Sequence, residues 1–144
     1  MFSKGCEYGL KAVIHLCIES RNGKKLNIKE ISKAIDTPEP FTAKVLQLLA
    51  KRKIISSIKG PGGGFYIDPD AKPIPVIHVI DAIDGREAFE RCGLGLKECS
   101  SKHPCPIHNE FKSYSTQLKS LLMHKSVQEL AAGIVSGKTF VTNL

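Results

Sequence analysis

The chain has no tryptophan, and Phe, Trp and Tyr together make up only 6% of it. No run of apolar residues is long enough to cross a bilayer, so we expect no partner within the membrane. The first residues also lack the apolar core of a signal peptide, which predicts a cytoplasmic protein. None of the five cysteines belongs to a Cys-x-x-Cys pair, the usual spacing of structural zinc sites. The absence of a recognisable acid/base constellation predicts a protein that is no enzyme and has no small-molecule substrate.

Acidic residues are fewer than basic ones. The chain has 14 Asp and Glu against 21 Lys and Arg, which gives a formal net charge of +7 over 144 residues. A compact basic domain attracts polyanions, so nucleic acid and anionic membrane surfaces are both candidate partners. At this length we expect one domain, with a short appendage, that folds without disulfides.

Helical spacing of apolar residues predicts three helices in the first part of the chain. The first covers residues 7–20. Asn27 is expected to cap the second, with Glu30 reaching back to the Asn27 backbone amide. Thr37 is expected to cap the third, with Pro38 at the first helical position and an end near Arg52. The inward positions of this third helix are predicted to be Phe41, Val45, Leu48 and Leu49.

Two strands are predicted next, at residues 54–58 and 65–67, joined by a glycine-rich turn. A fourth helix follows at residues 76–83 and ends at Gly85. A long helix begins near residue 106, and Ser126 and Glu129 have the spacing of a capping box that opens a final short helix. The predicted fold class is mostly α with a small β-hairpin wing, in the order of a winged helix-turn-helix.

The third helix is the candidate for entering the major groove of duplex DNA. Such a helix exposes short polar or basic groups near its start, and Thr42 and Lys44 are predicted to lie on its outward face. Lys51, Arg52 and Lys53 crowd its other end. Taken alone, these three charges favour an ordinary solvated helix end.

The predicted wing must approach phosphates or the minor groove closely. Lys59 supplies positive charge there, and Gly60, Gly62 and Gly63 remove side chains that would hold the backbone away. The glycines could also form a plain turn or a loop that cradles nucleotide phosphates. The nucleotide loop is disfavoured because a strand follows it, whereas that motif opens a helix.

Three segments resemble the Rrf-two family of bacterial transcriptional regulators, which includes IscR, NsrR and CymR. The sequence SIKGPGGGF at residues 57–65 is similar to the wing of that family, and EYGLKA at residues 7–12 is similar to its opening helix. IPV at residues 74–76 and VIDAIDG at residues 79–85 resemble the segment after the wing. The resemblance spans nearly the whole chain.

This resemblance implies a homodimer that binds a partly palindromic double-stranded DNA operator. The long helix after residue 106 would then be the dimerisation element. Residues 40–44 would begin the recognition helix, and Lys59 would be the basic residue of the wing. The candidate DNA-binding residues are therefore Pro40, Phe41, Thr42, Lys44, Lys51, Lys59, Gly60, Pro61, Gly62 and Gly63.

Cys92, Cys99 and Cys105 lie close together in a segment without periodicity. In a reducing compartment, such a cluster favours metal or redox chemistry over a disulfide framework. Soft thiolates select zinc, iron–sulfur clusters or copper(I), and spacings of six and five residues suit a loop around a bulky inorganic core. Unligated thiols and a redox disulfide remain the alternatives.

The family resemblance implies an iron–sulfur cluster at these three cysteines. His108 matches the position of a fourth ligand in IscR-like members, which favours a [2Fe–2S] centre. Glu7 matches the acidic ligand that NsrR-like members take from the first helix of the partner, which leaves a [4Fe–4S] cluster as the competing interpretation. The chain has one extra residue between Cys92 and Cys99 relative to the family.

The sequence thus predicts a winged helix-turn-helix at residues 1–85, a cluster-binding loop at 86–106, and dimerisation and C-terminal helices at 107–144. The predicted function is a transcriptional regulator that senses iron–sulfur, redox or nitric oxide status through the Cys92–His108 loop. One alternative is a cluster-free regulator controlled by a partner protein or by cysteine oxidation. A small thiol or metal enzyme is the more distant alternative.

Overall fold

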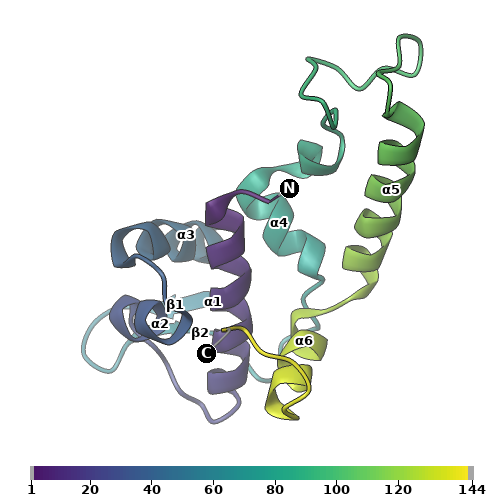
Figure 1. Ribbon diagram of the computed structural model, residues 1–144. Coiled ribbons are helices and arrows are strands. Elements are labelled where there is room, and N and C mark those ends of the chain that lie inside the picture. The colour runs from purple at the N-terminus through teal and green to yellow at the C-terminus, as the bar shows by residue number, and fades with distance from the viewer. Residues whose placement is uncertain (1, 143–144) are drawn as a thin grey trace.

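The computed structural model describes residues 2–142, and Figure 1 shows their arrangement. Three helices open the chain: α1 (Lys4–Ser20), α2 (Ile28–Ile35) and α3 (Glu39–Lys51). An antiparallel hairpin follows, with β1 (Ser56–Ile58) and β2 (Gly64–Tyr66) in a register that pairs Ser57 with Phe65. The remaining elements are α4 (Val76–Asp84), the 3-10 turn η1 (Arg86–Phe89), α5 (His108–His124) and α6 (Val127–Val135). The predicted winged helix-turn-helix is confirmed.

Side-chain caps explain where several helices begin. α1 begins at Lys4, earlier than predicted, because Ser3 Oγ accepts a hydrogen bond from the Cys6 amide at 3.0 Å. The Asn27 cap is confirmed, since its Oδ1 accepts from the Glu30 amide at 2.8 Å. Glu30 reaches the side-chain amide of Asn27, however, and not its backbone. The capping box at the start of α6 is confirmed.

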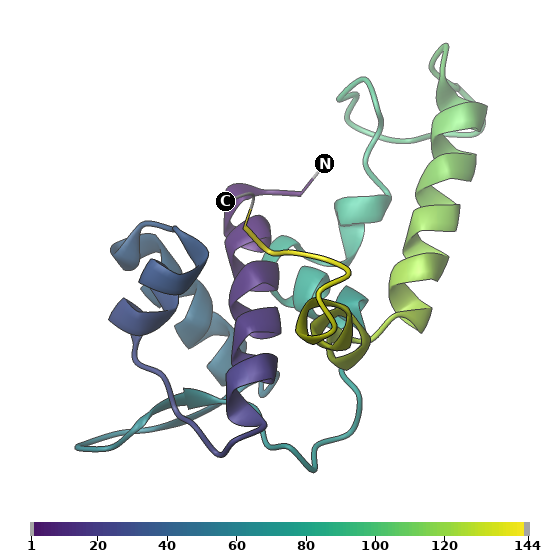
Figure 2. The same cartoon turned by 60° about the horizontal axis from the view of Figure 1, so that its bottom comes forward.

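α1 is the central element of the fold. It contacts α2, α3, α4 and α6, and the two views show these helices around it (Figures 1 and 2). Gly9 permits this close packing, because a Cβ at that position would overlap the Ile83 side chain. The fully buried side chains Leu16, Ile31 and Leu46 form part of the core around it. Each contributes about 1.5–3 kcal/mol relative to an exposed side chain.

α6 shares this core, although it follows α5 in the chain. Val127 and Ala131 are buried with the residues of α1 to α3. Backbone hydrogen bonds between Val76 and Lys125 and between Val127 and Ile74 also join the start of α6 to the start of α4. The C-terminal segment therefore returns to the helix–wing unit, which we define as α1 to α4 with the hairpin. The division of the chain at residues 85 and 106 stays a prediction.

α5 stands to one side of the helix–wing unit (Figure 1). Its Leu118 and Leu122 pack against a second core cluster that contains Ile80 and Phe89. Tyr114 and Leu121, seven residues apart on one face of α5, are each more than half exposed. α5 thus has one packed side and one open apolar side. Within residues 2–142, no helix combines the length and the apolar content needed to span a membrane.

Candidate nucleic-acid interface and cysteine loop

α3 presents a polar outward face along its length. Lys44, Gln47 and Lys51 are exposed at spacings of three and four residues, which places them on one face of the helix. The opposite face is buried and holds Val45, Leu46 and Leu49. This outward face has the polar and basic character that base edges and phosphates require.

The start of α3 differs from the prediction. Pro38 is the cap residue, in extended conformation, and the helix begins at Glu39. Thr37 does not cap it, because its hydroxyl pairs with the Thr42 hydroxyl at 2.7 Å. Pro40 therefore lies in the first helical turn, where its missing amide leaves no helical hydrogen bond unmade.

Two further expectations for α3 are wrong. Thr42 was expected on the outward face but is 0% exposed, because its hydroxyl donates to the Pro38 carbonyl at 2.8 Å. Phe41 was expected to point inward but is 46% exposed, with its ring edge-on to Tyr8 at a centroid distance of 5.4 Å. Leu46, which the inward set did not include, is fully buried in its place. The inward face is therefore rotated slightly from the predicted one.

The wing is anchored to the helices at one end and open at the other. The Phe65 amide donates to the Leu26 carbonyl at 2.7 Å, and the Leu26 amide donates to the Phe65 carbonyl at 3.0 Å. At the exposed tip, Gly60 has a φ of 91° and Gly62 a φ of 73°, values that favour glycine. The chain reverses there and leaves Lys59 and Pro61 exposed.

A groove of about 640 Å³ separates α3 from the wing. Gln47 and Lys51 line it from the helix, and Ser57 and Lys59 line it from the hairpin. The structure thus brings together the two predicted basic residues Lys51 and Lys59. Gln47 and Ser57 were missed by sequence reasoning. The three-residue step from Lys44 to Gln47 on the outward face was the available signal for the first.

We define the cysteine loop as residues 90–107, between η1 and α5. It contains no regular element, and all of its residues are exposed except Cys92, Cys99, Ser100 and Cys105. The end of η1, directly before the loop, is joined to α5, because Ser115 Oγ donates to the Phe89 carbonyl at 2.7 Å. The three cysteines are therefore among the few loop side chains that turn away from solvent.

The predicted ligands come together as two pairs. The sulfur of Cys92 lies 3.8 Å from that of Cys105, and the sulfur of Cys99 lies 3.4 Å from Nδ1 of His108. His108 is buried, and its Nε2 lies 3.4 Å from Ser101 Oγ. In the part of the chain that the structure describes, no group of three or more His, Cys, Asp or Glu side chains converges on one metal position.

The chemistry of these donors fits a soft metal centre. Thiolates and a neutral imidazole are the ligands of iron–sulfur and zinc sites. The backbone amides of Leu94 and Leu96 lower the pKa of the Cys92 thiol and so favour its thiolate. The amide of Ile107 also lowers the pKa of Cys105, but burial and the neighbouring Cys92 and Cys99 outweigh it and raise that pKa.

The other candidate ligand and the other cysteines lie on α1. Glu7 pairs with Lys4 at 3.0 Å and leaves 43% of its side chain exposed. Cys6 and Cys17 are buried. Burial and the neighbouring Asp84 raise the pKa of Cys6 to about 12. These two thiols are therefore protonated and poor nucleophiles at neutral pH.

Comparison with known proteins identifies the family. The family model Rrf2, described as an iron-dependent transcriptional regulator, matches residues 2–133. An Aquifex aeolicus protein predicted to be an HTH-type transcriptional regulator is 28% identical over 132 residues, which cover 90% of each chain. The HTH-type transcriptional regulator IscR of Yersinia pseudotuberculosis is 28% identical over 128 residues, 89% of this chain and 76% of that protein.

The fold has a close match among solved structures. CymR, the global cysteine regulator of B. subtilis, superimposes with a TM-score of 0.73 at 19% identity, over 92% of this chain and 96% of that one. This match concerns the fold, whereas the family model covers sequence along most of the chain. The chain belongs to the Rrf2 family of DNA-binding transcriptional regulators, and not to a class of enzymes.

Proposed function

We propose that this regulator controls its DNA binding through an iron–sulfur cluster held by the cysteine loop. The observation that carries the proposal is the pairing of Cys92 with Cys105 and of Cys99 with His108 on one otherwise exposed loop. The match to a family of iron-dependent regulators and the similarity to IscR support the same chemistry. The cluster would supply a centre whose presence or oxidation state depends on iron, sulfide and oxidants.

Two pairs of donors favour a [2Fe–2S] centre over a [4Fe–4S] one. Each iron of a [2Fe–2S] core takes two protein ligands, and mixed Cys and His ligation of such cores is known. The 3.8 Å between the Cys92 and Cys105 sulfurs equals the separation at which a tetrahedral metal with bonds of about 2.3 Å holds two sulfurs. Glu7 of a second chain remains the competing fourth ligand, and it would favour the larger cluster.

The outward face of α3 and the wing are the proposed contacts to DNA in the cytoplasm. Lys44, Gln47 and Lys51 would enter the major groove, and Lys59 would meet phosphates or the minor groove. Gly60, Pro61, Gly62 and Gly63 would let the wing approach closely. Pro40 and Phe41, exposed at the start of α3, complete the set, whereas the burial of Thr42 argues against a direct contact.

The open side of α5 supports a homodimer. Tyr114 and Leu121 give that side an apolar surface on a helix of 17 residues. Two copies joined through α5 would present two winged units to a partly palindromic operator, with half-sites one helical turn apart. The cysteine loop directly precedes α5. Whether the loop is ordered would therefore affect how the two winged units of the dimer are positioned.

The proposed mechanism is a shift between two populations of the dimer. Ser115 ties the end of η1, directly before the cysteine loop, to α5, and η1 itself follows α4 of the helix–wing unit. An ordered cysteine loop would hold α5 and α4 in one relative orientation, and a disordered loop would allow other orientations. Only a cluster state that favours one arrangement can change operator affinity.

A cluster-free redox switch is the second candidate, because Cys92 and Cys105 are already neighbours. A disulfide needs the two sulfurs at about 2.05 Å, so the pair would have to close from 3.8 Å. In that reaction the two thiols lose two protons and two electrons to an oxidant such as hydrogen peroxide, and one S–S bond forms.

Anaerobic purification of the full chain tests the cluster proposal directly. We expect visible absorbance together with iron and acid-labile sulfide, and loss of all three in Cys92→Ala, Cys99→Ala and Cys105→Ala. Cys17→Ala, outside the loop, is the matched control and should retain the cluster. His108→Ala and Glu7→Gln separate the two candidate fourth ligands, since only the true ligand should change the spectrum.

Operator binding then tests the regulatory part. Cluster-loaded and cluster-free protein should differ in operator affinity or footprint. A colourless protein whose DNA binding responds to peroxide, and loses that response in Cys105→Ala, would support the disulfide switch instead. A colourless protein that retains one zinc would point to a structural metal.

A further inference from the structure

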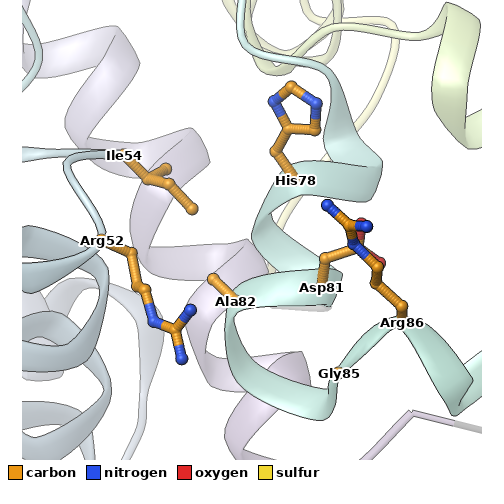
Figure 3. A pocket seen from close by; sticks show the side chains of 7 residues that line it. All are labelled: Arg52, Ile54, His78, Asp81, Ala82, Gly85 and Arg86. Atoms are coloured by element: carbon orange, nitrogen blue, oxygen red, sulfur yellow. The ribbon is translucent and has the colours of Figure 1, made fainter.

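A second hollow lies beside the connection from α3 to β1 and is lined by residues other than those of the groove at the wing. It has a volume of about 460 Å³ and lies between the end of α3, α4 and the start of η1 (Figure 3). Arg52, Ile54, His78, Asp81, Ala82, Gly85 and Arg86 line it. No part of the proposed DNA or cluster chemistry uses this hollow, and its size is in the range of small-molecule sites.

Its charged lining is unbalanced. Arg52 extends from the end of α3 toward α4, and Arg86 turns back along α4 toward Asp81, so the two guanidinium groups flank the hollow from different sides (Figure 3). Among the residues described, the ion pairs are Lys4–Glu7 and Lys24–Glu19, and neither arginine takes part in one. Asp81 is the single acidic residue of the lining, against two arginines.

Guanidinium groups that form no ion pair with a carboxylate of residues 2–142 are suited to an external one. Arginine presents a planar fork of donors that matches carboxylate in two-point hydrogen bonds. Ile54 and Ala82, both partly buried, offer a small apolar floor between the two charges. We propose that this hollow is an effector site for a small organic diacid, with one carboxylate on Arg52 and the other on Arg86.

The position of the hollow separates it from the DNA contacts. Arg52 follows Lys51 in sequence, but one residue turns the direction by about 100° around a helix. Lys51 therefore lines the groove beside the wing, whereas Arg52 lines the hollow beside α4. A diacid held by both arginines would link the end of the recognition helix to η1, from which the cysteine loop begins.

The test uses the full-length protein and three diacids of increasing length: succinate, glutarate and adipate. Calorimetry at constant ionic strength should show that at least one of them binds about tenfold or more tightly than acetate, which has one carboxylate. In ¹⁵N spectra, the amides of Ala82 and Gly85 should shift on addition of that diacid. Arg52→Gln and Arg86→Gln should each reduce binding to the level of acetate.

Arg21→Gln is the matched control, since Arg21 is exposed at the end of α1 and does not line the hollow. It should bind the diacid as the unmodified protein does. Both lining arginines are exposed, so we expect their variants to fold. Dispersed ¹⁵N spectra of all three variants check this.

Three outcomes would overturn the proposal. In the first, none of the diacids binds more tightly than acetate. In the second, Arg21→Gln loses as much affinity as the two lining variants, which would indicate general attraction to a basic protein. In the third, diacids do not bind, while Arg52→Gln and Arg86→Gln weaken binding to nonspecific duplex DNA. The arginines would then be contacts to DNA phosphates.

Discussion

The helix–wing unit and the cysteine loop are held in shape by different means. The unit packs four helices and a hairpin around apolar side chains such as Leu16 and Leu46, which no solvent reaches. In the cysteine loop, nearly every residue is exposed, and the side chains that turn inward are three cysteines and Ser100. The unit therefore carries its stability in its own core, whereas the loop has few buried side chains, and the proposed cluster would be what orders it.

The largest expected effect tests this difference by removing one leucine from each region. Leu46→Ala deletes a fully buried side chain of α3 and should lower the free energy of unfolding by about 2–5 kcal/mol. Leu96→Ala deletes a leucine of the cysteine loop that is 54% exposed, and the change should stay within about 0.5 kcal/mol. Urea denaturation measures both. Equal losses would mean that the loop belongs to the core of the fold.

The next effect concerns a DNA contact that belongs to the helix–wing unit. Lys59→Ala removes the charge at the exposed wing and should weaken DNA binding by about 1–3 kcal/mol. If Lys59 meets only phosphate, the loss should be uniform across sequences and the salt dependence should become shallower. Fluorescence anisotropy with operator and random duplexes distinguishes the two cases.

Lys138→Ala is the control for this measurement. Lys138 is exposed beyond α6, which lies across α1 from the wing in both views (Figures 1 and 2). Lys138→Ala removes the same charge as Lys59→Ala and should leave DNA affinity nearly unchanged. Equal weakening by both variants would show that only net charge matters and would contradict the assignment of the wing.

The same contrast explains what could be predicted from the sequence. The caps at Asn27 and Ser126 are local signals, because the side chain and the amide that it accepts from are three residues apart. The wing is local as well, since its glycines and its strands are neighbours in the chain. The close approach of α1 to α4 at Gly9 involves residues far apart in sequence, and no local pattern indicates it.

The errors in α3 have a similar cause. The periodicity of its apolar residues is compatible with two slightly different inward faces. The structure selects the one in which Thr42 is buried, because the Pro38 carbonyl satisfies its hydroxyl. For the cysteine loop, the sequence indicated the donors, but spacing alone could not show that Cys92 pairs with Cys105 and Cys99 with His108.

A smaller effect separates stability from recognition within α3. Thr42→Val keeps the shape of the buried side chain but removes its hydrogen bonds to Pro38 and Thr37, and should lower stability by about 0.5–1.5 kcal/mol. Because Thr42 is not exposed, the folded variant should bind operator as the unmodified protein does. A loss of affinity without a loss of stability would return Thr42 to the DNA-binding surface.

The smallest effect is a pH dependence that belongs to the helix–wing unit. Burial lowers the pKa of His15 on α1 below its ordinary value of 6.5; Glu19 opposes this shift, and Lys24 adds to it. The folded protein therefore binds this proton less readily than the unfolded chain does. His15 costs no stability well above pH 6.5, and its cost grows as the pH falls below that value. His15→Gln should consequently lose less stability between pH 7 and pH 5 than the unmodified protein, as measured by urea denaturation.

His103→Gln changes an exposed histidine of the cysteine loop and should leave the pH dependence of unfolding as it is. If His103→Gln altered that dependence instead, a loop side chain would contribute to global stability, and the separation of the two regions would fail.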